Sequence, residues 1–208
     1  MLLVASLSMD FGLIRRATLH LNGERETDTT HSFMLALLVL ECGRDLVPSL
    51  DVAVACQMAL VHDLPEIFAG DTSTLLPLSA EAREAKEERE RAATARLGAL
   101  LGAESALLRM LHRYERQACL ESVFVRYLDK FAPKYTLILS DGAAVLGAGV
   151  SHEEYAESLR LQGEKLRSMA PDLEVMHGAF GDLCERTLAS FSWATNSNAA
   201  QLHCAPRC

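Results

Sequence analysis

Residues 60–71, with the sequence LVHDLPEIFAGD, place four titratable side chains in an otherwise apolar stretch. His62 and Asp63 are adjacent and Glu66 follows one turn later, so on a helix these three side chains approach the same side. Burying an unpaired carboxylate costs roughly several kcal/mol, so Asp63 requires a cation, a hydrogen-bond network or an exposed pocket edge. A metal ion would satisfy His62 and Asp63 together, with Glu66 beside them as a base.

Two further polar side chains interrupt apolar stretches elsewhere in the chain. His31 begins HSFMLALLVLEC, and Asp129 lies within VFVRYLDKF. Together with His62 and Asp63 they would form a mixed nitrogen and oxygen ligand set, suited to a divalent ion such as Mn, Fe, Co or Zn with positions left for water and substrate. A metal ion can lower the pKa of bound water from about 15.7 to about 7. The reaction class that this set predicts is metal-assisted hydrolysis.

Each of these residues also has an ordinary structural interpretation. His31 could cap a helix or be a hydrogen-bonded core histidine. Glu66 follows Pro65 near a helix end and could be a simple exposed acid. Asp129 could pair with a cation of its own helix, as a surface carboxylate does. The available cations are Arg126, Lys130 and Lys134. It is the combination of the four ligand candidates that favours a metal site.

The composition limits the classes of protein and partner. With 208 residues, 50% of them apolar, the chain is long enough for one domain with a sizeable core. A net charge of −8 argues against a nucleic-acid-binding surface and favours a small-molecule partner. The six cysteines lack CxxC pairing, which is typical of a reduced, cytoplasmic protein. The apolar start, MLLVASLSM, is too short to span a membrane and lacks a basic leading region, so no membrane partner is expected.

The elements that position these residues are predicted to be helices. Leu- and Ala-rich stretches without sustained alternation indicate an all-α fold. Helices are expected over about residues 5–16, 31–42, 50–64, 79–101, 104–115, 118–140, 151–168 and 172–190. Thr29 or Thr30 is expected to cap the second helix, and Pro65 to end or kink the third.

The remaining segments are predicted to be connections. Residues 20–30, HLNGERETDTT, form a polar connection with Asn22-Gly23 as a turn signal, and 71–79 and 142–149 are expected to be loops. The tail 191–208 has no periodicity and is expected to be disordered. The chain is therefore expected to be a single helical domain over residues 1–190.

The order of the candidate ligands resembles that of a known family. His31, then the adjacent His62 and Asp63, then Asp129, on successive helices, is similar to the HD-domain metal-dependent phosphohydrolases. DTTHSFMLALLVL, MALVHDLPEIFAGDTST and VRYLDKF more narrowly resemble the YfbR-like 5'-deoxynucleotidase branch, over about residues 9–165. The resemblance implies an all-α HD-domain helical bundle with its metal site between core helices.

The resemblance assigns roles to these residues. His31, His62, Asp63 and Asp129 would be the ligands of one divalent metal ion, which could be Mn, Co, Fe, Zn or Mg. Glu66 would be the catalytic carboxylate that accepts a proton from the attacking water or passes it to the leaving ribose oxygen.

The resemblance also assigns substrate-binding residues. Arg16 would hold the substrate phosphate, for which a bidentate guanidinium is suited. It could instead be an ordinary cation at a helix C-terminus beside Arg15. The loop that follows Glu66 would bind the nucleotide, with Asp71 near the sugar or phosphate and counted among the catalytic residues as well. The loop residues are Asp71, Thr72, Ser73 and Thr74. Ala17 and residues 72–74 depart from the family pattern, which leaves base and sugar selectivity open.

The expected reaction is the hydrolysis of a deoxyribonucleoside 5'-monophosphate to the nucleoside and phosphate. One alternative is a deoxynucleoside triphosphate triphosphohydrolase, which would release triphosphate. Another is a non-catalytic module that binds nucleotides for regulation. The resemblance also implies a homodimer, and the apolar composition is compatible with a buried interface.

Overall fold

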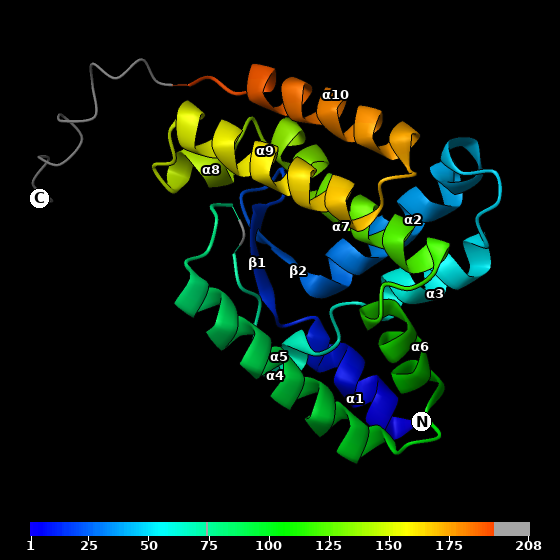
Figure 1. Ribbon diagram of the computed structural model, residues 1–208. Coiled ribbons are helices and arrows are strands. Elements are labelled where there is room, and N and C mark those ends of the chain that lie inside the picture. The colour runs from blue at the N-terminus through cyan, green and yellow to red at the C-terminus, as the bar shows by residue number, and fades with distance from the viewer. Residues whose placement is uncertain (74, 194–208) are drawn as a thin grey trace, which may run out of the picture.

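The structure, a computed structural model, describes residues 1–73 and 75–193 and is a helical bundle with one small hairpin (Figure 1). The helices are α1 (Leu2–Phe11), α2 (Asp28–Leu46), α3 (Val52–Val61), α4 (Glu66–Ala69), α5 (Ala80–Leu101), α6 (Ala106–Glu115), α7 (Leu120–Leu139), α8 (Ala143–Gly147), α9 (His152–Met169) and α10 (Glu174–Ser190). The strands are β1 (Arg15–Leu19) and β2 (Arg25–Thr27). The expected all-α fold class is confirmed, apart from this hairpin.

The main core lies where α7 packs against α2, α3 and α10. Leu35 from α2, Met58 from α3 and Phe124 and Leu128 from α7 are almost fully buried. Burying each such side chain contributes about 1.5–3 kcal/mol relative to exposure. The candidate ligands thus lie on, or directly after, three helices that pack together in the main core, which positions the site.

The hairpin corrects the expectation of a helix over 5–16. The first helix ends at Phe11, and β1 pairs antiparallel with β2, with Arg15 opposite Thr27. The turn between the strands contains Gly23 at φ +81°, as its Asn-Gly signal allows. Arg16 thus lies on a strand, not at a helix C-terminus, and the alternative of a helix-end cation does not apply.

The second helix begins earlier than expected. Thr27, not Thr29 or Thr30, is the N-cap: its hydroxyl accepts from the backbone N–H of Thr30 at 3.2 Å, and the Thr30 hydroxyl accepts from the backbone N–H of Thr27 at 3.0 Å. This reciprocal capping satisfies two N–H groups that a helix start leaves free. The helix starts at Asp28, which places His31 at the end of its first turn.

The third helix is interrupted as Pro65 predicts. It ends at Val61 with His62 as its C-cap, and a turn leads into α4, for which Pro65 is the N-cap. The backbone N–H of Glu66 donates to the carbonyl of Asp63 at 2.8 Å within this turn. His62, Asp63 and Glu66 therefore do not share one regular helix. The stretch Val52–Ala69 is long and apolar enough to pass a membrane-span test, but it is divided between these two helices and contributes to the core.

Two further expectations need correction. The expected loop 142–149 contains the short helix α8. The expected tail begins with Phe191, which is buried and stacks on Tyr155 with 6.0 Å between the ring centroids, so the fold extends past residue 190. The rest of the predicted tail, 194–208, lies outside the described residues, as does Thr74.

Candidate metal centre

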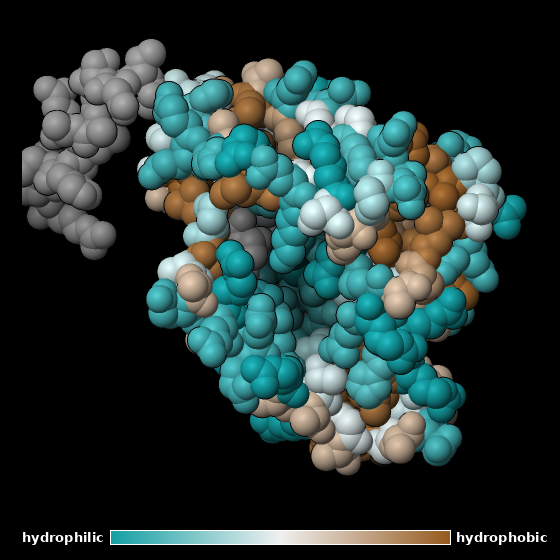
Figure 2. Space-filling view, viewed as in Figure 1, coloured by the Kyte–Doolittle hydropathy of each residue, from teal (hydrophilic) through white to brown (hydrophobic). Residues whose placement is uncertain are grey.

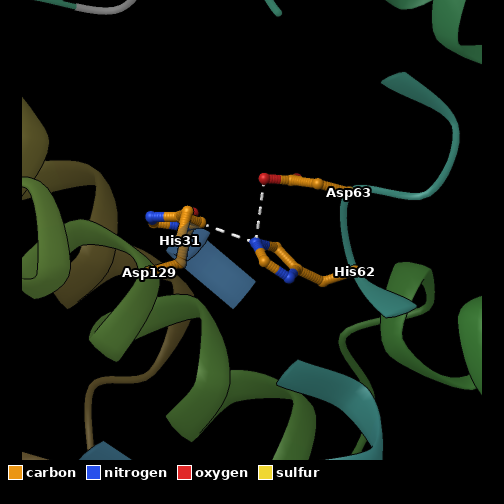
Figure 3. Close-up of side chains that lie close together, drawn as sticks. All are labelled: His31, His62, Asp63 and Asp129. Atoms are coloured by element: carbon orange, nitrogen blue, oxygen red, sulfur yellow. Dashed lines mark hydrogen bonds and ion pairs between the residues drawn. The ribbon is translucent and has the colours of Figure 1, made fainter. Parts of the chain in front are cut away.

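Four side chains from three separate segments converge between the core helices (Figure 3). His31 comes from α2, His62 and Asp63 from the end of α3 and the turn after it, and Asp129 from α7. Each offers one ligand atom, and these atoms all lie within 4.8 Å of one another. The structure thus brings together the four residues that the sequence singled out, and their donor set suits a divalent metal ion.

The orientation of His62 fits a metal ligand. Its Nδ1–H donates to the carbonyl of Ala59 at 2.9 Å, which directs Nε2 at the cluster. Nε2 lies 3.0 Å from the Asp63 carboxylate and 3.6 Å from that of Asp129, yet it has no hydrogen-bond partner among the described residues. Burial alone would lower the pKa of His62, but the facing carboxylates raise it to about 9. The two carboxylates therefore favour a positive charge beside His62 Nε2, and a metal ion would supply it.

His31 faces a buried carboxylate that the sequence reasoning missed. His31 Nε2 lies 3.1 Å from Asp129, and its Nδ1 lies 3.8 Å from the carboxylate of Glu26 on β2. Glu26 is 1% exposed and accepts a hydrogen bond from the Thr18 hydroxyl on β1. At 3.8 Å the two groups are not hydrogen-bonded, and His31 Nδ1 has no hydrogen-bond partner among the described residues. A carboxylate on this side of a ligating histidine can fix the ring orientation and raise its basicity once it accepts the ring N–H. The only sequence signal was its position in the polar segment ERETDTTH, which resembles a solvated connection.

Asp129 is a buried ligand candidate that also has a partner on its own helix. It is 4% exposed and pairs with Lys130 at 2.9 Å, so one of the ordinary pairings is present. Burial alone would raise the pKa of Asp129, but Lys130 and the two histidines hold it well below its usual range. Asp129 is therefore charged, and its burial among the histidines distinguishes it from a surface carboxylate.

Arg16 reaches the cluster from β1. One of its terminal nitrogens lies 2.8 Å from Asp63 and 3.0 Å from Asp28. Asp28 is fully buried and was also missed from the sequence. Its burial, together with the charge of Asp63, raises the pKa of Asp28 to about 6. The hairpin therefore supplies both an oriented guanidinium and the carboxylate of Glu26 that faces His31.

Glu66 lies beside the candidate ligands in a low-dielectric position. It is 8% exposed, and its Oε2 has no hydrogen-bond partner within the part of the chain that the structure describes. Burial, followed by the charges of Asp63 and Asp28, raises the pKa of Glu66 to about 11. The carboxyl group is therefore able to hold a proton at neutral pH, as a general acid must.

An open cleft gives access to this centre. Two cavities share Arg16, Asp71, Asp129 and Lys130 in their walls, so they lie side by side at this centre. The space-filling view is hollowed between α5 and the helices α7 and α9, with mostly hydrophilic residues around the hollow (Figure 2). The loop residues Asp71, Thr72 and Ser73 also lie along the cleft, and Arg89 of α5 donates to the Thr72 hydroxyl at 3.0 Å.

The arrangement of the ligand candidates agrees with a comparison with protein families. A family model described as an HD domain matches residues 13–166, which include all four of them. The chain belongs to the HD-domain family. The HD-domain fold predicted from the order of the ligand candidates is thus confirmed.

Solved structures show the same fold as this HD-domain chain. A protein of Magnetospirillum magnetotacticum MS-1, described as a predicted metal-dependent phosphohydrolase, has a TM-score of 0.70 at 24% identity over 91% of this chain and 94% of its own. A conserved hypothetical protein of Pyrococcus furiosus has a TM-score of 0.59 at 22% identity over 89% of this chain and 99% of its own. A protein of Pyrococcus horikoshii OT3 has a TM-score of 0.56 at 22% identity over 88% of this chain and 99% of its own. A comparison with curated proteins gave no match.

Proposed function

We propose that this HD-domain chain is a metal-dependent phosphohydrolase that acts on deoxyribonucleoside 5'-monophosphates. One observation carries the proposal: the buried His62 Nε2 faces two carboxylates, while Glu66 and Arg16 lie against the same cluster. The Magnetospirillum protein that shares the fold is described as a predicted metal-dependent phosphohydrolase, which supports the reaction class.

The four ligand candidates would hold one divalent metal ion, and the ion would lower the pKa of a bound water and polarise a phosphoryl oxygen. Mn, Co, Fe, Zn and Mg are the candidates for this ion. The chain's own contribution is to position the donors: Ala59 orients His62, the carboxylate of Glu26 faces His31, and Asp129 lies between the two rings.

Arg16 and Glu66 would act on the substrate itself. Asp28 and Asp63 hold the Arg16 guanidinium through one nitrogen, which leaves its other N–H groups for a phosphate oxygen. Positive charge at the phosphoryl oxygens stabilises the transition state more than the ground state. Glu66, which is able to hold a proton at neutral pH, would donate this proton to the leaving ribose oxygen as a general acid, and its unpartnered Oε2 is the atom for this transfer.

The nucleotide preference rests on the sequence resemblance to the YfbR-like branch and on the shape of the cleft. Beyond Arg16 the cleft continues past Leu137 and Tyr155, with Thr18 and Gln162 as polar groups in its wall. This wall mixes apolar and polar side chains: Leu137 and Tyr155 would contact the base, and Thr18 and Gln162 would hydrogen-bond polar groups of the nucleoside. The loop residues Asp71, Thr72 and Ser73 border the cleft and would contact the sugar; Thr74 belongs to the same proposed loop.

The alternative substrate is a deoxynucleoside triphosphate. The cations in the cleft wall support this alternative, because they could bind its additional phosphate groups; they include Lys86, Arg126 and Lys130. A non-catalytic regulatory module is a weaker alternative, because a binder has no need of the buried acid Glu66 beside the ligand candidates.

The test is phosphate release from a panel of deoxy- and ribonucleoside mono- and triphosphates by protein loaded with Mn or Co. Orthophosphate from deoxynucleoside monophosphates would support the proposal and rank the bases. Triphosphate release from a deoxynucleoside triphosphate would replace the proposal with the triphosphohydrolase. Absence of release from the whole panel would overturn both.

A further inference from the structure

The cleft wall formed by α5, α6 and α7 carries a cation without an ion pair and a hydroxyl without a hydrogen bond, as far as the described residues go. We define this wall by Lys86, Tyr114, Arg126 and Lys130, which all border the same cavity as His62 and Asp63. Arg126 makes no ion pair with any carboxylate of the described residues, and its guanidinium carbon lies 5.0 Å from the centre of the Tyr114 ring. Its charge is therefore available to a ligand.

Tyr114 is the second unused group in this wall. Its side chain belongs to a residue only 3% exposed, and its hydroxyl has no hydrogen-bond partner within residues 1–73 and 75–193. The ring lies edge-on to His62 with 5.7 Å between the centroids, so it borders the metal centre directly. Buried hydroxyl groups are normally hydrogen-bonded, and one that is not calls for a ligand or water as its partner.

The acidic side chains of the same wall already have partners. Glu90 pairs with Lys86, and Glu115 accepts a hydrogen bond from the Thr94 hydroxyl at 3.0 Å. Neither carboxylate forms an ion pair with Arg126 among the described residues, so its N–H groups remain available as donors. An anion is the kind of ligand that these donors fit.

Further cations gather around the same wall. Lys165 on α9 is faced by Arg126, Lys130, Arg83 and Lys86, and after burial these like charges lower the pKa of Lys165. The protein as a whole is acidic, with a net charge of −8, so this grouping is a local feature and not a consequence of composition. A local concentration of cations in a cleft raises the concentration of anionic ligands there.

We propose that Arg126, Tyr114 and Lys86 form a second phosphate subsite, so that the cleft binds anions that carry another phosphate group beyond the one at the metal centre. This rests on the proposed function, which places the first phosphate between the metal ligands and Arg16. Arg126 precedes Asp129 by three residues on α7, so the two side chains share a helix face about 4.5 Å apart along the axis. A diphosphate group would reach from one position to the other.

The test compares inorganic pyrophosphate with orthophosphate by calorimetric titration of the Mn-loaded protein, with the metal content measured after each titration. We expect pyrophosphate to bind at least about tenfold more tightly than orthophosphate to the unmodified protein. Arg126→Gln should reduce pyrophosphate affinity about tenfold and orthophosphate affinity less than about twofold. Arg91→Gln makes the same change in charge on an exposed, Glu88-paired residue of α5 and should alter neither.

A second variant keeps the test decisive if Arg126→Gln disturbs the fold, as circular dichroism would show. Tyr114→Phe keeps the buried ring and removes only the unpartnered hydroxyl, and it should also lower pyrophosphate affinity selectively. Equal weakening of both anions would assign Arg126 to the first phosphate, and unchanged affinities in both variants would place the second phosphate elsewhere; either result overturns the subsite. Because the titration needs no turnover, failure of the nucleotide hydrolysis assay remains a separate result.

Discussion

Asp63 and Glu66 lie within one turn of each other, but their surroundings give them different chemistry. Asp63 contacts the His62 Nε2 and Arg16, and although burial would raise its pKa, these partners hold it well below the usual range. Glu66 has no ion-pair partner in the described part of the chain, and burial raises its pKa. One carboxylate is thus kept charged, as a metal ligand must be, and the other is able to carry a proton.

This difference predicts different outcomes for two alanine substitutions. Glu66→Ala should keep the metal ion and lose about 10²–10⁴-fold in turnover, because it removes a proton carrier and no ligand. Asp63→Ala should lose both metal and activity. Metal content by mass spectrometry, together with orthophosphate release, separates the two. Turnover by a metal-free Asp63→Ala preparation would contradict the proposed mechanism.

Glu26 provides a prediction about positioning. Its carboxylate faces His31 Nδ1 from β2, so Glu26→Gln should loosen the orientation of the ring and weaken metal affinity about 10–100-fold. Titration against a competing chelator measures this affinity. Glu24→Gln, on an exposed residue two positions earlier in the chain, is the matched control and should leave the affinity unchanged. Equal affinities for both variants would show that Glu26 does not support the ligand.

At the scale of elements, the sequence predicted the features that local residue patterns determine. The long helices and the break at Pro65 follow from composition and proline chemistry, and the four ligand candidates were visible as polar interruptions of apolar stretches. The hairpin was missed because strands of five and three residues show no sustained alternation. Glu26 and Asp28 were missed with it, since only the pairing of β1 with β2 and the early start of α2 bury them.

Lys134 provides a prediction for α7. It is buried, donates to the Lys130 carbonyl at 2.9 Å and to Gln162 on α9 at 3.0 Å, and burial lowers its pKa to about 8. An unfolded lysine titrates near 10.5, so between about pH 8 and 10.5 the unfolded chain binds more protons and stability rises with pH. Lys134→Met has no titrating amine at this position, so its stability should lack this rise with pH.

The measurement for Lys134 is denaturant unfolding of both proteins across alkaline pH. Between about pH 7.5 and 10, the free energy of unfolding of the unmodified protein should gain roughly 2 kcal/mol relative to Lys134→Met. Other groups that titrate in this range affect both proteins, and the difference between them isolates Lys134. Parallel stability curves would show that the buried amine keeps its ordinary pKa in the fold.

At the scale of the whole molecule, charge and apolar surface are distributed unevenly. The net charge of −8 would repel a phosphate compound at long range, while the cations of the cleft attract it nearby. Salt screens interactions beyond about 8 Å at physiological ionic strength, so the local cations should dominate binding. The outer face of α2, in contrast, presents apolar side chains to solvent.

That face of α2 carries our prediction of a homodimer. Phe33, Leu37 and Leu40 are 60%, 49% and 61% exposed, and their spacing of four and three residues places them on one side of the helix. Exposed apolar surface of this kind marks interaction sites, and a two-fold dimer would bury the same patch from both copies. Leu37→Glu should therefore shift the mass measured by light scattering after gel filtration from dimer to monomer. Leu139→Glu, at an equally exposed leucine near the end of α7, should leave the mass unchanged. A monomer in the unmodified protein, or a dimer that survives Leu37→Glu, would refute this interface.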